Sequence, residues 1–284
     1  MQEKVRCRIA PSLGGGFDGT PSEVWGTEPY IQELDQDKPC IFFGMYGIPD
    51  FMALWRHKGK KYILFAGTDI QHFIKGYWLD YKGEIRVDPR PLAQWINKYC
   101  ESWVENDAQK RVLGAHGITA QVCPSFLGDI KKYPVNYKQS DVPKVFMSVS
   151  GDNFEQYGWD VIERIAHLTP RVTYYLYGSS NWKTRHSNVI IRGRVPIDVM
   201  NNEVKAMQCG LRLNTGTDGF SEITAKSVLW GQWPIVYRHY SYPHISNVAC
   251  EEELIKLLNS LRYRENVNPA REYFIQNINK YPWI

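Results

Sequence analysis

A chain of 284 residues is long enough for two domains of about 100–150 residues each. Its composition, with 43% hydrophobic, 23% charged and 14% aromatic residues, is ordinary for a folded protein. The formal net charge of +4 is compatible with an anionic ligand, a membrane surface or DNA, but no basic run typical of a nucleic-acid-binding domain is present.

The sequence indicates neither a membrane span nor a disulfide framework. It contains no run of about 20 apolar residues, and its first residues lack an apolar segment of signal-peptide length. The six cysteines are scattered, without a Cys-x-x-Cys pair or histidines at zinc spacing, which favours reduced thiols. We therefore expect a cytoplasmic protein.

Short apolar segments alternate with segments of helical spacing, which predicts an α/β fold with parallel strands. In the first half of the chain we expect strands at 4–10, 41–45, 62–66, 102–104 and 121–123. Helices are expected from residue 49 and over 91–101, whereas 111–114 has the pattern of strand and turn material.

A polar segment at 131–143, with prolines toward both ends, has the character of a linker. After it we expect strands at 144–149, 172–177, 189–191, 211–214 and 234–237. Helices are expected at 158–168, 196–205, 221–230, 251–261 and 269–280. The predicted organisation is an N-terminal Rossmann-like domain over 1–138, a C-terminal one over 139–268, and a tail helix over 269–284.

A glycine-rich segment follows the first predicted strand. Residues 14–19 formally match the G-x-G-x-x-G pattern, but a dinucleotide site needs a helix that begins inside the motif. Thr20-Pro21-Ser22 is poor helix material, so an NAD site is disfavoured. Two such domains form a cleft at the carboxyl ends of their strands. We expect Gly15 and Gly16 to form a flexible loop that approaches a ligand there, or else a plain surface turn.

Polar residues elsewhere in the first half have two interpretations each. Asp35-Gln36-Asp37 matches a metal-binding triplet, but its surroundings indicate a solvated loop or helix end, so we expect no protein-bound metal. Asp69 ends a predicted strand and either faces the cleft or caps the next helix. His116 stands between turn glycines, as a cleft-facing residue or as a loop residue without function.

The most informative stretch runs from residue 192 to 236, where strands, loops and helices alternate. Ser221 is suited to cap a helix, and the free N–H groups at such a helix start attract anions. Arg192, Arg194 and Arg212 add positive charge near this helix start. A leaving diphosphate needs such charge, because negative charge builds on its oxygens in the transition state.

This stretch resembles the C-terminal domain of the retaining GT-B glycosyltransferases known as group-one glycosyl transferases. The resemblance rests on Gly193-Arg194-Val195-Pro196, on Asp218-Gly219-Phe220-Ser221, and on the helix pattern at 226–231. It implies a GT-B fold, α/β with two Rossmann-like domains facing across a cleft, and a tail helix that returns to the first domain. The first half resembles the family more weakly, through 65–69 and 122–124.

The resemblance implies roles for individual residues. Arg194 and Val195 should lie beside the nucleobase, and Asp218 stands at the first acid of the family's E-x7-E pair and should face the donor sugar. The N–H groups of Gly219, Phe220 and Ser221 should meet sugar or phosphate oxygens, with Ser150 and Gly151 near the diphosphate. The candidate catalytic residues are Asp218, Arg194, Lys226 and Asp69, and Arg192 and Arg212 complete the candidate donor site.

Two positions depart from the family pattern. Lys226 stands where the second acid of the pair binds ribose hydroxyls, and a lysine cannot accept hydrogen bonds from hydroxyls. Asn153 and Gln156 stand where the family has a basic phosphate clamp. Both departures leave the nucleotide of the donor open among UDP-, GDP- and ADP-sugars.

The expected function is transfer of a sugar from a nucleotide-sugar, used as co-substrate, to an acceptor hydroxyl. Retention at the anomeric carbon is implied by the resemblance alone, and no permanently bound cofactor is expected. The acceptor is a glycan or a lipid-linked glycan. Two alternatives stay open: a virus-type transferase acting on a modified pyrimidine in DNA, and a non-catalytic protein that binds nucleotides or glycans.

Overall fold

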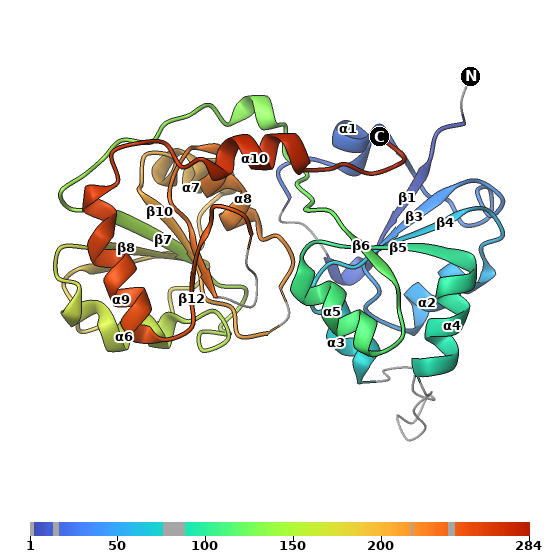
Figure 1. The fold of residues 1–284 in the computed structure, drawn as a ribbon, viewed down its shortest axis with the longest axis horizontal. Helices are drawn as coiled ribbons and strands as arrows, with labels where there is room; N and C mark the ends of the chain where they lie inside the picture. The colour runs from blue at the N-terminus through green and yellow to red at the C-terminus, as the bar shows by residue number, and fades with distance from the viewer. Residues whose placement is uncertain (1–2, 14–16, 76–88, 217, 238–241) are drawn as a thin grey trace. The chain divides into compact units, whose positions relative to one another are not determined.

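The computed structural model describes residues 3–13, 17–75, 89–216, 218–237 and 242–284. They form two compact units, each built on one six-stranded parallel sheet (Figure 1). The first unit comprises Met1–Asp129, Thr217–Phe220 and Asn277–Ile284, and the second comprises Ile130–Gly216 and Ser221–Gln276.

The sheet of the first unit has the strand order β2-β1-β3-β4-β5-β6. Its strands are β1 (Arg6–Ile9), β2 (Glu28–Pro29), β3 (Cys40–Phe43), β4 (Lys61–Leu64), β5 (Cys100–Val104) and β6 (Ala120–Val122). Every residue of β3 and β4 is buried, as expected for central strands of a parallel sheet with both faces covered.

The first unit carries α1 (Pro21–Trp25), α2 (Ile48–Arg56), α3 (Asp69–Ile74), α4 (Pro89–Tyr99), α5 (Asp107–Ala115) and the short η1 (Pro11–Leu13). Helix α1 corrects our interpretation of 20–22 as poor helix material. The Thr20 hydroxyl accepts the N–H of Glu23, and the Glu23 carboxylate accepts the N–H of Thr20. This capping box, followed by Pro21 in the first helical turn, is sufficient to start a helix.

Helix α5 is a second correction, because 111–114 is helical rather than strand and turn. The Asn106 side chain caps this helix by accepting the N–H of Gln109 at 2.9 Å. Gln109 and Leu113 lie one helical turn apart and are both buried against the unit. The helical period places the buried side chains on one face, which a short strand pattern does not distinguish.

The second sheet has the strand order β12-β11-β10-β7-β8-β9, which is the order of the Rossmann fold. Its strands are β7 (Lys144–Ser148), β8 (Thr173–Tyr177), β9 (Val189–Gly193), β10 (Cys209–Arg212), β11 (Ile235–Tyr237) and β12 (Ser246–Val248). The chain reverses its direction of strand addition between β7 and β10, and ligands of such sheets bind at this point, beyond the carboxyl ends of the strands.

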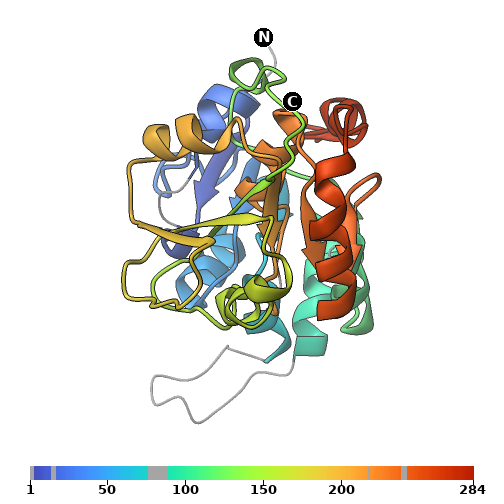
Figure 2. The same cartoon turned by 90° about the vertical axis from the view of Figure 1, so that its left-hand side faces the viewer.

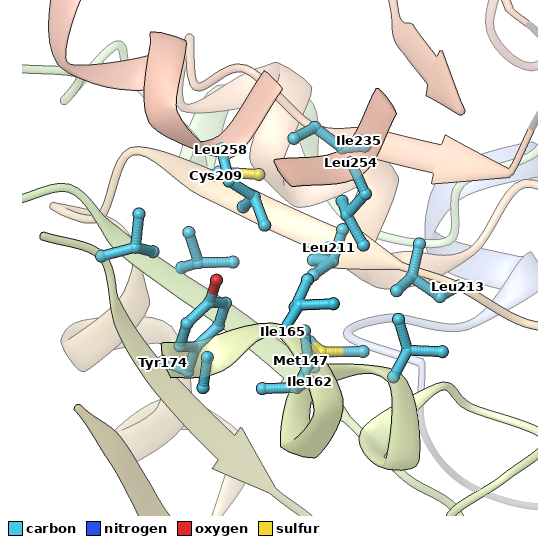
Figure 3. Close-up of a cluster of buried hydrophobic side chains, with 14 of the residues drawn as sticks. Met147, Ile162, Ile165, Tyr174, Cys209, Leu211, Leu213, Ile235, Leu254 and Leu258 are labelled. Atoms are coloured by element: carbon cyan, nitrogen blue, oxygen red, sulfur yellow. The ribbon is translucent and has the colours of Figure 1, made fainter. Parts of the chain in front are cut away.

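The helices of the second unit are α6 (Trp159–Ile165), α7 (Ile197–Val204), α8 (Glu222–Leu229), α9 (Glu251–Ser260), α10 (Ala270–Asn277), η2 (Ile130–Lys132), η3 (Ala166–Leu168) and η5 (Leu261–Tyr263). Helices α6 and α9 line the core: Ile162 and Leu258 pack with Met147, Leu211 and Ile235 of the strands (Figure 3). Figure 2 shows the orange-red α9 running alongside the second sheet.

Residues 130–138, which we assigned to the first domain, contact the second unit. The N–H groups of Asn136 and Tyr137 donate to the carbonyl of Trp230 at 3.0 and 3.1 Å, and the Tyr137 ring is buried. At the end of the chain, α10 belongs to the second unit up to Gln276, and the last residues belong to the first. Within the described part of the chain, no helix is long and apolar enough to span a membrane.

Candidate functional site

Asp69 follows β4 at the carboxyl edge of the first sheet, inside a tight turn. Its fully buried carboxylate accepts N–H groups from Met45 at 2.9 Å, Ala66 at 3.1 Å and Ile70 at 2.9 Å. Burial raises the pKa of Asp69 to about 6, and these hydrogen bonds hold it lower than burial alone would. The carboxylate therefore ties together the chain segments that leave β3 and β4.

Glu105 follows β5 at the same edge and is also buried. Its carboxylate accepts the Ser125 hydroxyl and, at 2.8 Å, the N–H of Phe220. Burial, with repulsion from Asp218 and Asp69, raises the pKa of Glu105 to about 8, although the two hydrogen bonds lower it. No lysine or arginine of the described residues pairs with it, so Glu105 holds a proton for much of the time near neutral pH.

The predicted residues Asp218, Gly219 and Phe220 lie beside Glu105. The carbonyl of Asp218 accepts amide hydrogens of Asn106 at 2.9 Å and Gln109 at 3.1 Å, both at the start of α5. A Cβ atom on Gly219 would come within 1.7 Å of the Glu105 carboxylate. Three polar side chains thus hold this short segment by its backbone, at a distance that only glycine permits.

We did not predict Glu105 from the sequence, although a usable signal exists. It directly follows the strand predicted at 102–104 and so lies beyond the carboxyl end of β5, as Asp69 lies beyond the carboxyl end of β4. An acid just beyond a buried parallel strand lies at the carboxyl edge, where ligands of these sheets bind. The rule that selected Asp69 would have selected Glu105 as well.

At the carboxyl edge of the second sheet, predicted residues follow the two central strands. Ser150 and Gly151 come after β7 and are exposed, and Gly151 has a φ of 61°, which a side chain would disfavour. Arg212 ends β10, and its guanidinium lies 4.5 Å from the centre of the Tyr157 ring. Small exposed residues beside a ring-stacked cation are suited to an anionic ligand.

The other basic residues of this edge have different surroundings. Arg192 donates to the Glu203 carboxylate of α7, which also accepts the Tyr177 hydroxyl and has a lowered pKa because of both contacts. This pair lines a cavity of about 290 Å³ together with Lys144 at the start of β7. Arg194 is exposed and Val195 is half-buried in the loop before α7.

Helix α8 begins as the sequence predicted. The Ser221 hydroxyl accepts the N–H of Thr224 at 3.3 Å, which confirms Ser221 as the cap. One turn into the helix, Lys226 is buried, and its ammonium nitrogen lies 3.7 Å from the Glu222 carboxylate. The lysine at the position of the family's second acid is thus paired with an acid of its own helix.

Three predicted features do not have the surroundings we expected or lie outside the described residues. His116 is not at the carboxyl edge: it ends α5 and precedes β6, so it lies at the opposite edge of the sheet, where its ring nitrogen contacts the carbonyl of Val112 at 3.0 Å. Asp35 is not solvated: it is buried and paired with Arg6 and Lys38, which lower its pKa despite burial. Gly15 and Gly16 lie outside the described residues.

Across residues 3–13, 17–75, 89–216, 218–237 and 242–284, no group of three or more histidine, cysteine, aspartate or glutamate side chains is arranged to hold a metal ion.

Comparisons with known proteins find likeness in structure rather than in sequence. No family model matches the chain, and no curated protein matches its sequence. Anabaena HepE in complex with UDP superimposes with a TM-score of 0.56 at 10% identity, over 97% of this chain and 96% of HepE.

Two longer proteins have the same fold. S. aureus TarM, solved with fondaparinux, α-GlcNAc-glycerol and UDP, has a TM-score of 0.60 at 14% identity, over 89% of this chain and 54% of TarM. The pneumococcal O-GlcNAc transferase GtfA, solved with UDP and GlcNAc, has a TM-score of 0.52 at 10% identity, over 86% of this chain. The chain spans about half the length of these two structures (54% of each). The predicted fold class is confirmed: the chain has the GT-B fold, with two Rossmann-like domains.

Proposed function

We propose that this protein transfers a sugar from a nucleotide-sugar to an acceptor hydroxyl, with retention at the anomeric carbon. The observation that carries the proposal is the likeness to HepE, which extends over 97% of this chain and 96% of HepE in a structure that holds UDP. A second HepE structure holds UDP-glucose. The common fold and the polar residues at the carboxyl edges support the same chemistry here.

The donor binds at the carboxyl edge of the second sheet in this proposal, and the first domain serves the acceptor. Ser150 and Gly151 offer backbone N–H groups to the diphosphate at the end of β7. Arg212, at the end of the neighbouring β10, supplies positive charge, and Val195 meets the nucleobase. The position between β7 and β10 is where the strand order reverses, which supports this choice of edge.

The chemistry requires stabilisation of the leaving diphosphate. When the bond between the anomeric carbon and the diphosphate oxygen breaks, the electron pair goes to that oxygen, and cations placed beforehand lower the barrier. Arg194 and Arg212 are the principal candidates, with Lys226 beside Glu222 as a further source of charge. Arg192 contributes less, because Glu203 already neutralises it.

In this proposal Asp218 faces the donor sugar. Its backbone is held by hydrogen bonds to side chains of the first unit. Two amide hydrogens on its carbonyl, and the contact of Glu105 with the N–H of Phe220 two residues later, fix the backbone of this segment. Positioning of this kind is how a rigid scaffold lowers the entropic cost of reaction. Asp69 acts through the adjoining turn rather than on the sugar, because its carboxylate is fully buried.

The test is incubation of the full chain with labelled UDP-, GDP- and ADP-glucose and a panel of glycan, lipid-linked and DNA acceptors. We expect transfer from one donor, and a product with the anomeric configuration of that donor by proton coupling. An inverted product overturns retention alone. Tight nucleotide binding without transfer from any donor to any acceptor identifies a binding protein and overturns the proposal.

A nucleotide screen by thermal unfolding names the donor independently of the acceptor. A ligand present at 100 times its Kd stabilises the folded state by about 2.7 kcal/mol. For units of this size, such a gain raises Tm by several degrees. We expect the nucleoside diphosphate that raises Tm to be the one released from the nucleotide-sugar that serves as donor.

A further inference from the structure

Four aromatic side chains form a continuous stripe across α2 and α4 of the first unit, two helices that lie side by side in Figure 1. The members of this aromatic stripe are Phe51, Trp55, Trp95 and Tyr99. Ring centres are 5.8 Å apart for Phe51 and Trp55, 4.7 Å for Trp55 and Trp95, and 5.6 Å for Trp95 and Tyr99. The two helices therefore present one aromatic surface rather than isolated rings.

Two rings of the aromatic stripe are more exposed than packing against the core of the first unit requires. Phe51 and Trp95 rest against the core of the first unit, whereas Trp55 is 50% exposed and Tyr99 is 49% exposed. Large aromatic side chains bury most of their surface when they serve only a core. Neighbouring exposed rings of this size indicate a surface that contacts a membrane or another molecule.

The stripe is separate from the candidate site. Trp55 and Tyr99 stand at the carboxyl ends of α2 and α4, where β4 and β5 begin. Asp69 and Glu105 stand where those two strands end, at the opposite edge of the sheet. A partner on the stripe would leave the acids of the carboxyl edge uncovered, so the stripe has a role of its own.

Basic side chains flank the stripe. Arg56 and Lys58 follow Trp55 and are exposed, and the ammonium of Lys98 lies 5.0 Å from the centre of the Tyr99 ring. Among the described residues, acidic side chains on α2 and just after α4 are paired, whereas Asp37 is exposed and its backbone lies against Gly59, next to Lys58. Asp50, the acid of α2, is buried against Arg8 at 2.7 Å, and the sequence of α4 contains no acid. Beyond α4, Glu101 pairs with Lys60 at 2.9 Å.

We propose that the aromatic stripe docks the protein on an anionic lipid bilayer. Tryptophan and tyrosine favour the boundary between acyl chains and headgroups, because one part of each ring system is apolar and another forms hydrogen bonds. Arg56, Lys58 and Lys98 then lie at the level of anionic headgroups, which attract them. Lysine is depleted in protein–protein interfaces, so this combination favours a lipid surface over a protein partner.

The experiment is flotation of the full chain with vesicles of phosphatidylcholine alone, or of phosphatidylcholine and phosphatidylglycerol in equal parts. We expect the protein to float with the anionic vesicles, less at high salt because the charges are screened. Trp55→Ser combined with Tyr99→Ser should weaken this binding by about tenfold or more, since two interfacial anchors are lost. Both side chains are half-exposed, so the fold should survive, and thermal unfolding checks this.

A second variant, Lys58→Gln with Lys98→Gln, tests the charges on a surface whose aromatic rings are intact. It should weaken binding to the anionic vesicles by about tenfold and leave binding to phosphatidylcholine unchanged. The matched control is Tyr263→Ser, which removes a more exposed ring (65%) stacked on Arg262 in the second unit and should change nothing.

Two results would overturn the proposal. One is failure of the wild-type chain to float with anionic vesicles, or equal flotation of the wild type and the Trp55 and Tyr99 double variant. The other is concentration-dependent self-association in sedimentation that the double variant abolishes, which would identify a second copy as the occupant. Neither readout uses sugar transfer, so the outcome is independent of the proposed function.

Discussion

At the carboxyl edge of the first sheet, Asp69 and Glu105 are buried and pair with no cation of the described residues, whereas at that of the second sheet Arg194 is exposed and Arg212 stacks on a ring. Both edges belong to Rossmann-like units with parallel strands, so the backbone architecture does not account for the difference. The acids of the first edge accept N–H and O–H groups from the protein itself. At the second edge, Arg192 pairs with the Glu203 carboxylate, Arg212 is half-buried against the Tyr157 ring, and Arg194 is exposed.

This comparison shows how one architecture yields two kinds of surface. A buried carboxylate without a cation costs free energy, and it is tolerated where its hydrogen bonds hold several chain segments together. Glu105 does this for β5, for Ser125 and for the segment at 218–220. An exposed arginine costs little and holds nothing in place, but it attracts phosphate. We therefore propose that the first edge positions groups and that the second binds an anionic ligand.

The largest effect should come from closing the space at Gly219. Gly219→Ala places a Cβ atom 1.7 Å from the Glu105 carboxylate, so the segment must move away. We expect transfer activity to fall on the order of 100-fold, because displacement by about 1 Å has this effect on reacting groups. The readout is kcat/KM.

Gly114→Ala is the matched control for this substitution. Its Cβ would lie in open space on α5, so activity should be retained and Tm should rise slightly. Wild-type activity in Gly219→Ala would show that the positioning function of the first edge is unnecessary.

The second prediction compares two arginines of the second edge. Arg212→Ala should weaken nucleotide-sugar binding on the order of tenfold to a hundredfold, since a charge-assisted contact to phosphate is lost. Arg192→Ala should change it by less than about threefold, because Arg192 already pairs with Glu203 at the surface. Calorimetric titration of both variants is the measurement. Equal losses would show that the ion pair opens for the ligand.

The third prediction concerns the dependence of stability on pH. The pKa of Glu105 is raised by burial to about 8, from 4.5 in the unfolded chain. The folded protein therefore binds more protons than the unfolded one, and this contribution to stability is complete below pH 4.5 and lost as pH rises through 8. Between pH 7 and 8 the loss is about 1 kcal/mol, or a fall of about 2–4 °C in Tm.

Glu105→Gln should remove this slope, because the amide does not titrate. The window from pH 7 to 8 isolates Glu105. Asp69, whose pKa is about 6, is ionised by then, and His57, whose pKa is lowered by burial, is neutral. Asp69→Asn serves as the control: it should keep a slope between pH 7 and 8, shifted slightly to lower pH because the Asp69 charge no longer raises the pKa of Glu105. An unchanged slope in Glu105→Gln would assign the titration to another group.

The smallest expected effect is that of metal removal. If side-chain cations of the second edge stabilise the leaving diphosphate, EDTA should leave the transfer rate unchanged. A loss of activity that Mg²⁺ or Mn²⁺ restores would contradict this, and would shift the role of the second edge from supplying charge to orienting the donor.

Features of the fold with local signals were predictable from sequence. The buried apolar runs at 41–45 and 62–66 overlap all but the first residue of β3 and of β4, and α8 starts directly after its cap Ser221. Strand β12 was missed because Ser246–Val248 is short and half polar. Helix α1 starts at Pro21, the position at which a helix could begin, although Thr20-Pro21-Ser22 has the composition of poor helix material; the capping box of Thr20 and Glu23 accounts for the start.

The sequence by itself determined the alternation of strands and helices, the caps, and the resemblance that led to the GT-B fold, because these depend on neighbours within a few residues. Only the tertiary structure decided the burial and charge of the side chains at the carboxyl edges. The N–H of Phe220 and the carboxylate of Glu105 are 115 residues apart in sequence. Burial and hydrogen bonding at such a distance set the pKa of Glu105, and neither is encoded by its neighbours in the chain.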